Sequence, residues 1–217
     1  MRMNLKNNNR TNKRSLKINF KSIKLNNRNL FIFLISFSIV TVIIGFIFYF
    51  LISSKDKGSV NQVVMNNFQI KDNYNYLKLL MKSVFQNIYN ISLIWILGLS
   101  IIGIIAVIFI YFCEMFSIGF TMASIISTYK AKGILGIFVY LIPSKIFYII
   151  VLFLLSYFSI RISYKIIKLL FSNEEIKIKK DMKKYFKVLL FSMIAMVSIS
   201  MLEVFVDPFF IKLFTKI

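Results

Sequence analysis

Residues 30–53 read LFIFLISFSIVTVIIGFIFYFLIS and hold 24 residues without a single charge. At a rise of about 1.5 Å per residue, a helix of this length crosses the ~30 Å hydrocarbon core of a bilayer with some tilt. A cleavable signal peptide has a shorter apolar core and a cleavage site with small residues, and neither is seen here. The sequence therefore predicts a retained first transmembrane helix at 30–53.

The rest of the chain continues this pattern. Of the 217 residues, 58% are hydrophobic and 17% are charged, whereas soluble domains average ~45–50% apolar and ~25% charged. Further uncharged or nearly uncharged runs follow at 88–113, 115–129, 134–160 and 188–205. The run 115–129 is shorter than the ~20 residues of a normal span, so it is either a short third helix or a re-entrant arm. We predict an all-α, polytopic membrane helix bundle with about five transmembrane helices.

The positions of the basic residues predict the orientation. Nine Lys or Arg and no acid lie in 1–29, and nine more lie in 161–187, against five in 54–87. Because cytoplasmic segments are enriched in Lys and Arg, the N-terminus is expected inside and the C-terminus outside. Residues 1–29 are interpreted as a disordered cytoplasmic tail that contacts anionic membrane lipids. Residues 161–187 are then a basic cytoplasmic loop within a four-helix membrane domain, 88–217.

Residues 54–87 are expected to form an extracytoplasmic loop. From Tyr74 onward, apolar residues recur at helical spacing, which predicts an amphipathic helix at the outer membrane surface over 74–87. This loop is too short for an enzyme domain but long enough to contact a partner protein. Its candidate partner-contact residues are Asn66, Asn67 and Phe68.

Two charges fall inside predicted spans. Lys145 lies about 16 Å from the outer edge of the fourth run, near mid-membrane, and Glu203 lies near the end of the fifth. Intramembrane charges are commonly paired or functional. Lys145 is either paired with Glu203, satisfied by water and backbone, or part of a substrate or proton path. Pro143 is expected to kink the helix beside Lys145. Asp207 shares a helix face with Glu203, and the two carboxylates form either a cation site, a docking patch or a solvated helix end.

The amino-acid composition excludes several kinds of catalytic and metal-binding site. The chain has no histidine and one cysteine, Cys113, so no His/Cys metal site, histidine-activated nucleophile or intramolecular disulfide can form. No glycine-rich nucleotide-binding motif occurs; close helix contacts account for Gly98, Gly103 and Gly119. We expect no catalytic residue, metal, cofactor, nucleic-acid partner or small-molecule substrate.

Four short stretches carry a family resemblance: IWILGLSIIG at 94–103, FSIGFT at 116–121, IPSKIFY at 142–148 and LEVFVDP at 202–208. In order and spacing they resemble the stage II sporulation protein M family of endospore-forming bacteria, over roughly residues 28–217. The chain departs from the family pattern at Lys145, where an amide is expected, and near Ile105, where a proline is often found.

The resemblance implies a non-enzymatic membrane scaffold that localises peptidoglycan hydrolases during forespore engulfment. It further implies that the partners are stage II sporulation proteins D and P, and that the site is the mother-cell membrane at the sporulation septum of the bacterial cell. An alternative from another class is a membrane transporter or permease subunit, motivated by Lys145, Pro143 and the short third segment. A membrane enzyme is a weaker third option.

Overall fold

The computed structural model describes residues 27–68, 75–171 and 178–216, and the regular structure in these ranges is all helical. The elements are α1 Asn27–Leu51, α2 Ser54–Phe68, α3 Tyr76–Gly98, α4 Gly103–Tyr129, the 3₁₀ turn η2 Lys130–Lys132, α5 Gly133–Tyr140, the π-helical turn η3 Leu141–Lys145, α6 Ile146–Phe171, α7 Ile178–Met201, the π-helical turn η4 Leu202–Val206 and α8 Asp207–Lys216.

Four stretches of the described chain are long and apolar enough to cross a membrane: Asn27–Leu51, Gly103–Tyr140, Ile146–Phe171 and Lys179–Phe214. Large apolar side chains on their outer faces stay exposed, for example Ile39 at 57% and Ile194 at 69%. A soluble protein rarely exposes so many large apolar residues together, whereas lipid contact requires it. The predicted class, an all-α polytopic membrane protein, is confirmed.

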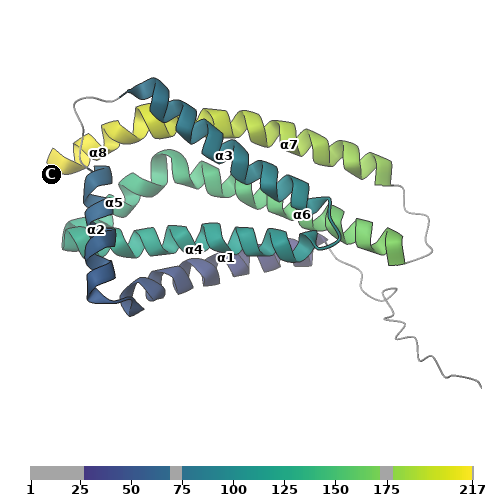
Figure 1. Ribbon diagram of the computed structural model, residues 1–217, viewed down its shortest axis with the longest axis horizontal. Helices are drawn as coiled ribbons and strands as arrows, with labels where there is room; N and C mark the ends of the chain where they lie inside the picture. The colour runs from purple at the N-terminus through teal and green to yellow at the C-terminus, as the bar shows by residue number, and fades with distance from the viewer. Residues whose placement is uncertain (1–26, 69–74, 172–177, 217) are drawn as a thin grey trace, which may run out of the picture.

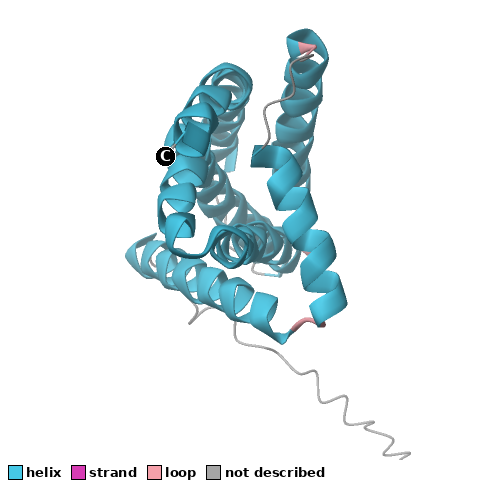
Figure 2. Cartoon of the chain, turned by 90° about the vertical axis from the view of Figure 1, so that its left-hand side faces the viewer, coloured by secondary structure: helices cyan, strands magenta, loops and turns pink. Residues whose placement is uncertain are grey.

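Helices α1, α3, α4, α6 and α7 run side by side along the long axis of the molecule, and α2 lies across one end (Figure 1). We call this end, which holds α2, η2, α5 and α8, the cap end, and Figure 2 views the molecule from it. The opposite end, where α1 begins and where α3 turns into α4, is the tail end. Residues 1–26, which make up nearly all of the predicted tail, lie outside the described residues.

The predicted boundaries of the second and third spans were wrong. The run 88–113 is not one helix, because α3 ends at Gly98 and α4 begins at Gly103. The predicted amphipathic segment 74–87 lies largely in the first half of α3, which runs with the bundle, and the helix that lies across the cap end is α2. The run 115–129 is neither a short span nor a re-entrant arm, since it is the second half of the 27-residue helix α4.

Hydropathy could not reveal this turn because three of its four residues are apolar. The chain reverses through Leu99-Ser100-Ile101-Ile102, and the backbone N–H of Ser100 donates to the carbonyl of Leu97 at 2.9 Å. The turn needs glycine on both sides. A Cβ on Gly98 would lie 2.7 Å from Cβ of Ser159, and a Cβ on Gly103 would overlap the carbonyl oxygen of Leu97.

The basic segment 161–187 is mostly helical, which also differs from the prediction of a loop. Helix α6 continues to Phe171 and α7 begins at Ile178. Lys and Arg are good helix formers. A run of charged residues therefore ends the hydrophobic stretch of a helix, while the helix itself continues. An ion pair between Lys165 and Asp181 joins the two helices at the tail end.

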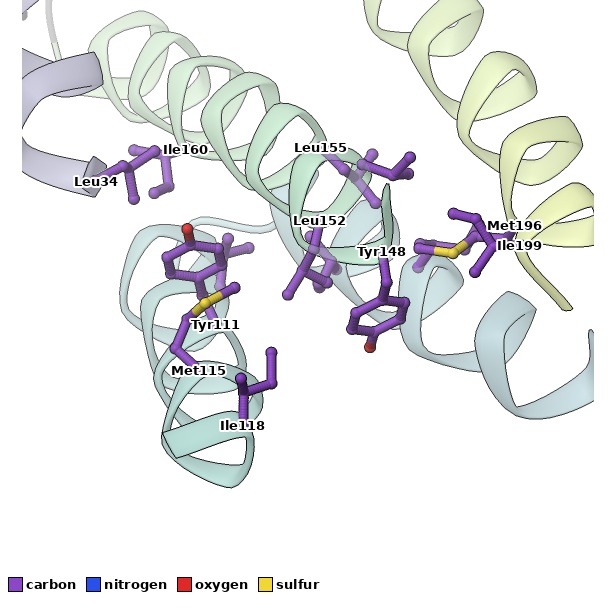
Figure 3. Packing of buried hydrophobic residues seen from close by; sticks show 14 of the residues in the cluster. Leu34, Tyr111, Met115, Ile118, Tyr148, Leu152, Leu155, Ile160, Met196 and Ile199 are labelled. Carbon is purple, nitrogen blue, oxygen red and sulfur yellow. The ribbon is translucent and has the colours of Figure 1, made fainter. Parts of the chain in front are cut away.

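The main core lies where α1, α3, α4, α6 and α7 meet. Its fully buried side chains include Leu34, Tyr111, Leu152, Leu155 and Met196 (Figure 3). In a bilayer these contacts stabilise the bundle through close packing, since lipid tails are as apolar as leucine.

Helices α1 and α4 approach each other closely at two glycines. A Cβ on Gly45 would overlap the carbonyl oxygen of Phe116, and a Cβ on Gly119 would overlap that of Val42. The two backbones therefore touch at two points, as small residues permit in membrane helices. The hydroxyl groups of Ser38 and Tyr111, 2.5 Å apart, hydrogen-bond between the same helices.

A second, smaller core joins the elements of the cap end. It is built on Val64 of α2, Ile125 of α4 and Phe214 of α8, with Tyr129 and Ile137 packed against it. The rings of Tyr129 and Phe214 meet edge to face with their centroids 5.2 Å apart. This core makes α2, the end of α4, α5 and α8 one packed unit.

The α1–α4 contact predicts the effect of one added methyl group. Gly119→Ala should lower the free energy of unfolding by about 1–3 kcal/mol, because the backbones must separate to admit the Cβ. Thermal melting of the purified protein in detergent measures this loss. Gly58→Ala is the matched control, since no atom lies within 4 Å of the added Cβ on exposed α2. An unchanged melting temperature for Gly119→Ala would show that the two backbones do not touch.

Candidate functional site

Two π-helical turns face each other inside the bundle. In η3 the N–H of Ile146 donates to the carbonyl of Leu141, and in η4 the N–H of Asp207 donates to that of Leu202. Both are five-residue steps beside a proline. Pro143 within η3 and Pro208 just after η4 have no N–H to donate, which breaks the normal α-helical ladder. Such π turns occur often at functional sites because they re-aim nearby side chains.

Two polar contacts join these turns. Lys145 Nζ donates to Glu203 Oε1 at 2.7 Å, and Ser144 Oγ donates to Asp207 Oδ2 at 2.7 Å. The Lys145 and Glu203 side chains are 28% and 16% exposed within the protein. Of the partners that the sequence left open for Lys145, the structure shows Glu203. Pro143 lies in η3 beside them, but its side chain is outside the described part.

Helix α3 supplies further donors to Glu203. Its Oε2 accepts from the Ser83 hydroxyl and from Asn87 Nδ2, the latter at 3.2 Å. Asn87 is buried, and the same amide nitrogen also donates to Ser200 Oγ at 2.9 Å. Glu203 therefore ties α3 to both π turns.

A second polar group lies deeper in the bundle, around Glu114 of α4. Its Oε1 accepts from Asn90 Nδ2 at 3.0 Å, and its Oε2 accepts from the Tyr148 hydroxyl at 2.9 Å. The predicted runs 88–113 and 115–129 leave Glu114 between two spans; this is wrong, because Glu114 lies within α4, about 16 Å along the helix from its first residue. The charge looked terminal only because the α3–α4 turn was missed.

We call these side chains together the polar cluster, and its members are Ser83, Asn87, Asn90, Glu114, Ser144, Lys145, Tyr148, Ser200, Glu203 and Asp207. Sequence reasoning found Lys145, Glu203 and Asp207 but missed the contribution of α3. The signal was available, because Ser83, Asn87 and Asn90 follow at intervals of four and three residues and so share one helix face.

Two cavities adjoin the polar cluster. One of about 370 Å³ lies between a face of α3 and a face of η4 and α8, and one of about 280 Å³ surrounds Glu114 and Tyr148. Gln86, Asn87 and Lys145 line both. Toward the tail end, the next turns of α3, α6 and α7 carry fully buried apolar side chains: Ile91, Ile94, Leu152 and Met196. The cavities therefore lie on the cap-end side of an apolar layer.

The other predicted residues lie elsewhere. Gly98 and Gly103 flank the α3–α4 turn, and Gly119 contacts α1. Asn66 is exposed on α2 and lines neither cavity, while the side chains of Asn67 and Phe68 lie outside the described part. No group of three or more His, Cys, Asp or Glu side chains in the described ranges could hold a metal ion.

The geometry defines a polytopic helical membrane protein whose interior polar groups bind one another across α3, α4, α6 and α7. The family model of Stage II sporulation protein M matches residues 6–208, so the chain belongs to this family and the sequence-based assignment is confirmed. Comparison with curated proteins and with solved structures found no match. Family membership makes the chain a membrane protein of sporulation engulfment.

The Lys145–Glu203 pair predicts non-additive stability losses. Lys145→Ala leaves a carboxylate without its cation, so adding Glu203→Gln should recover part of the loss. Melting of the two single variants and the double variant in detergent should give a coupling of about 0.5–2 kcal/mol. The Lys165–Asp181 pair is the control, because an ion pair near the aqueous phase should weaken with added salt more than the interior pair does. Additive losses at Lys145 and Glu203 would remove the pair as a stabilising contact.

The cavities predict water access to Cys113, which is exposed and lines the cavity around Glu114. A charged methanethiosulfonate reagent that cannot cross membranes should label Cys113 from outside intact cells, because it reacts with a hydrated thiolate. The matched control places the single cysteine one helical turn away on the exposed face of α4, as Phe109→Cys in a Cys113→Ser background. That thiol faces lipid and should stay unlabelled. Equal labelling of the two thiols would show that the cavity does not reach the outside.

Proposed function

We propose that the protein is a non-enzymatic scaffold that places peptidoglycan-cleaving enzymes at the septal membrane during engulfment. The observation that carries this proposal is the family match, because it covers residues 6–208 and so includes the whole polar cluster. The cluster supports it, since its side chains mainly satisfy one another and hold four helices in register. By family resemblance, the enzymes to be placed are stage II sporulation proteins D and P in the mother-cell membrane.

The orientation that fits this role puts the tail end in the cytoplasm and the cap end outside. We take α3 as a fifth crossing beside the four candidate spans; because the five long helices alternate in direction, this puts the N-terminus inside and the C-terminus outside. In the described chain the tail end carries the basic residues at the end of α6 and the start of α7, and the sequence of 1–29, up to the start of α1, holds nine more. Positive charge concentrated on one side is the usual mark of the cytoplasmic face.

The surface proposed to receive the partner enzymes is the exposed face of α2. This helix lies across the cap end, held by Val64 in the cap core and by the Tyr49 hydroxyl, which donates to Asn61 Oδ1 at 2.6 Å. Its outer side presents Val63 at 57% and Met65 at 45% exposure beside exposed Asn66. A rigid helix with exposed apolar residues and a polar rim is suited to protein contact.

The cavities favour one other function, a transporter or permease subunit. Two cavities that reach Lys145 and Glu114 and stop at an apolar layer resemble half of an access path. The apolar layer beyond it would have to open for transport. Solute flux into vesicles that contain the purified protein distinguishes the two functions, because the scaffold proposal predicts no flux.

The scaffold proposal predicts a separation of folding from recruitment. Changing Val63 and Met65 to Glu should leave the melting temperature within a few degrees, because both side chains are exposed. The same double change should abolish septal localisation of a fluorescently tagged peptidoglycan hydrolase. The control changes Lys183 and Lys184, exposed at the tail end, to Glu and should leave recruitment intact. Recruitment that survives the α2 change would move the contact to the membrane helices, and peptidoglycan cleavage by the purified protein alone would overturn the proposal.

A further inference from the structure

Glu114 is an interior carboxylate that no cation of the described chain neutralises. The polar cluster has one ammonium group but three carboxylates, with Lys145 against Glu114, Glu203 and Asp207. Lys145 pairs with Glu203, and within the described ranges no Lys or Arg forms an ion pair with Glu114. A charge in the middle of a membrane helix is costly unless an opposite charge accompanies it. The interior around Glu114 therefore lacks positive charge.

The hydrogen bonds around Glu114 suit its ionised form. Its Oε1 accepts from Asn90 Nδ2 at 3.0 Å, and its Oε2 accepts from the Tyr148 hydroxyl at 2.9 Å. The same nitrogen of Asn90 also donates to the Tyr148 hydroxyl at 3.3 Å, so this hydroxyl accepts one bond and donates another to Glu114. An ionised carboxylate accepts at both oxygens, whereas a protonated carboxyl group donates from one of them. The arrangement therefore favours a negative charge at Glu114.

Other oxygen atoms belong to residues that line the same cavity, whose volume is about 280 Å³. Asn90 makes both of its bonds through Nδ2, so its Oδ1 remains an acceptor. The side-chain oxygens of Gln86 and Ser117 make no hydrogen bond within the described chain. Carboxylate, amide and hydroxyl oxygens are the ligands that hard cations take. A cavity of this volume has room for an ion together with several waters.

Two lysines restrict where a cation can lie. Lys145 lines both cavities, but its Nζ lies 2.7 Å from Glu203 Oε1, which balances its charge. The larger cavity, of about 370 Å³, is also lined by Lys82, whose ammonium group repels a cation. The smaller cavity has the carboxylate of Glu114 in its place. The charges of the lining therefore favour the cavity around Glu114.

From this placement we propose that the cavity around Glu114 binds a small monovalent cation, Na⁺ or K⁺, with Glu114 as its charged ligand and the oxygens of Asn90, Gln86 and Ser117 as neutral ligands. One positive charge balances one carboxylate, whereas Ca²⁺ or Mg²⁺ would leave an excess charge inside the bundle. The absence of histidine excludes the usual transition-metal sites but not a cation bound by oxygen. The proposal does not depend on recruitment of hydrolases.

The test is melting of the full-length protein in detergent while Na⁺ or K⁺ replaces choline at constant ionic strength. Choline has the same charge, but its alkyl groups keep oxygen ligands away from the nitrogen. A cation that binds only the folded bundle should raise the melting temperature by about 3–6 °C near saturation.

Three variants locate the effect. Glu114→Gln removes the charged ligand and should abolish the rise in melting temperature. Ser117→Ala removes one neutral ligand and should raise the half-saturating cation concentration about 3–10-fold. Asp181→Asn is the matched control, because this carboxylate lines neither cavity, and it should keep the full rise.

Cys113 provides a second readout because it lines the same cavity. Its alkylation by iodoacetamide, a neutral reagent, should be slower in Na⁺ or K⁺ than in choline, and this difference should disappear in Glu114→Gln. The rates are measured in detergent below the melting temperature of each variant, so a variant that melts earlier still reports on the cavity.

Three outcomes would overturn the proposal. The first is equal melting in Na⁺, K⁺ and choline, which would leave a proton to neutralise Glu114. The second is stabilisation by Ca²⁺ or Mg²⁺ without any by Na⁺ or K⁺. The third is a cation effect that survives in Glu114→Gln but is lost in Asp207→Asn, which would place the ion in the larger cavity. Because no readout involves a hydrolase, these failures are distinguishable from failure of the scaffold proposal.

Discussion

The ion pair between Lys145 and Glu203 is the contact around which the interior of this bundle is arranged. In hydrocarbon a lone ammonium or carboxylate is costly, so each must find a partner inside the protein. Pairing them at 2.7 Å requires η3 and η4 to face each other, and the π geometry of both turns brings the side chains into line. Ser83 and Asn87 complete the shell around Glu203 and thereby fix the position of α3.

Two kinds of contact stabilise the bundle: polar contacts between side chains and close packing of helix backbones. Toward the cap end, polar side chains bind one another across α3, α4, α6 and α7 and specify which helix faces which. Between α1 and α4, Gly45 and Gly119 let backbones touch, and dispersion forces act without any polar group. Polar contacts specify how the helices are arranged, and close packing makes the arrangement rigid.

The proposed scaffold role needs a rigid frame and exposed surfaces, and the two ends of the molecule differ in what they offer. At the tail end, which we propose to be cytoplasmic, the ion pair between Lys165 and Asp181 joins α6 to α7. The cap end has its own small core around Val64, Ile125 and Phe214, which fixes α2 across the bundle. Surfaces held in this way bind partners without first losing conformational freedom.

By itself the sequence determined the class of the protein, its family, and the charged residues of the interior. Length and hydropathy identified 30–53, and the depth of Lys145 and Glu203 within apolar runs marked them as unusual. The tertiary structure alone decided where α3 ends and α4 begins, because the turn at 99–102 is as apolar as the helices it joins. That turn moved Glu114 from an expected membrane boundary into the bundle. The chain also encoded Ser83, Asn87 and Asn90 as a helical stripe, but which face of α3 turns inward depends on Glu203, 120 residues after Ser83. Partners so distant in sequence are brought together by helix packing, which local pattern does not specify.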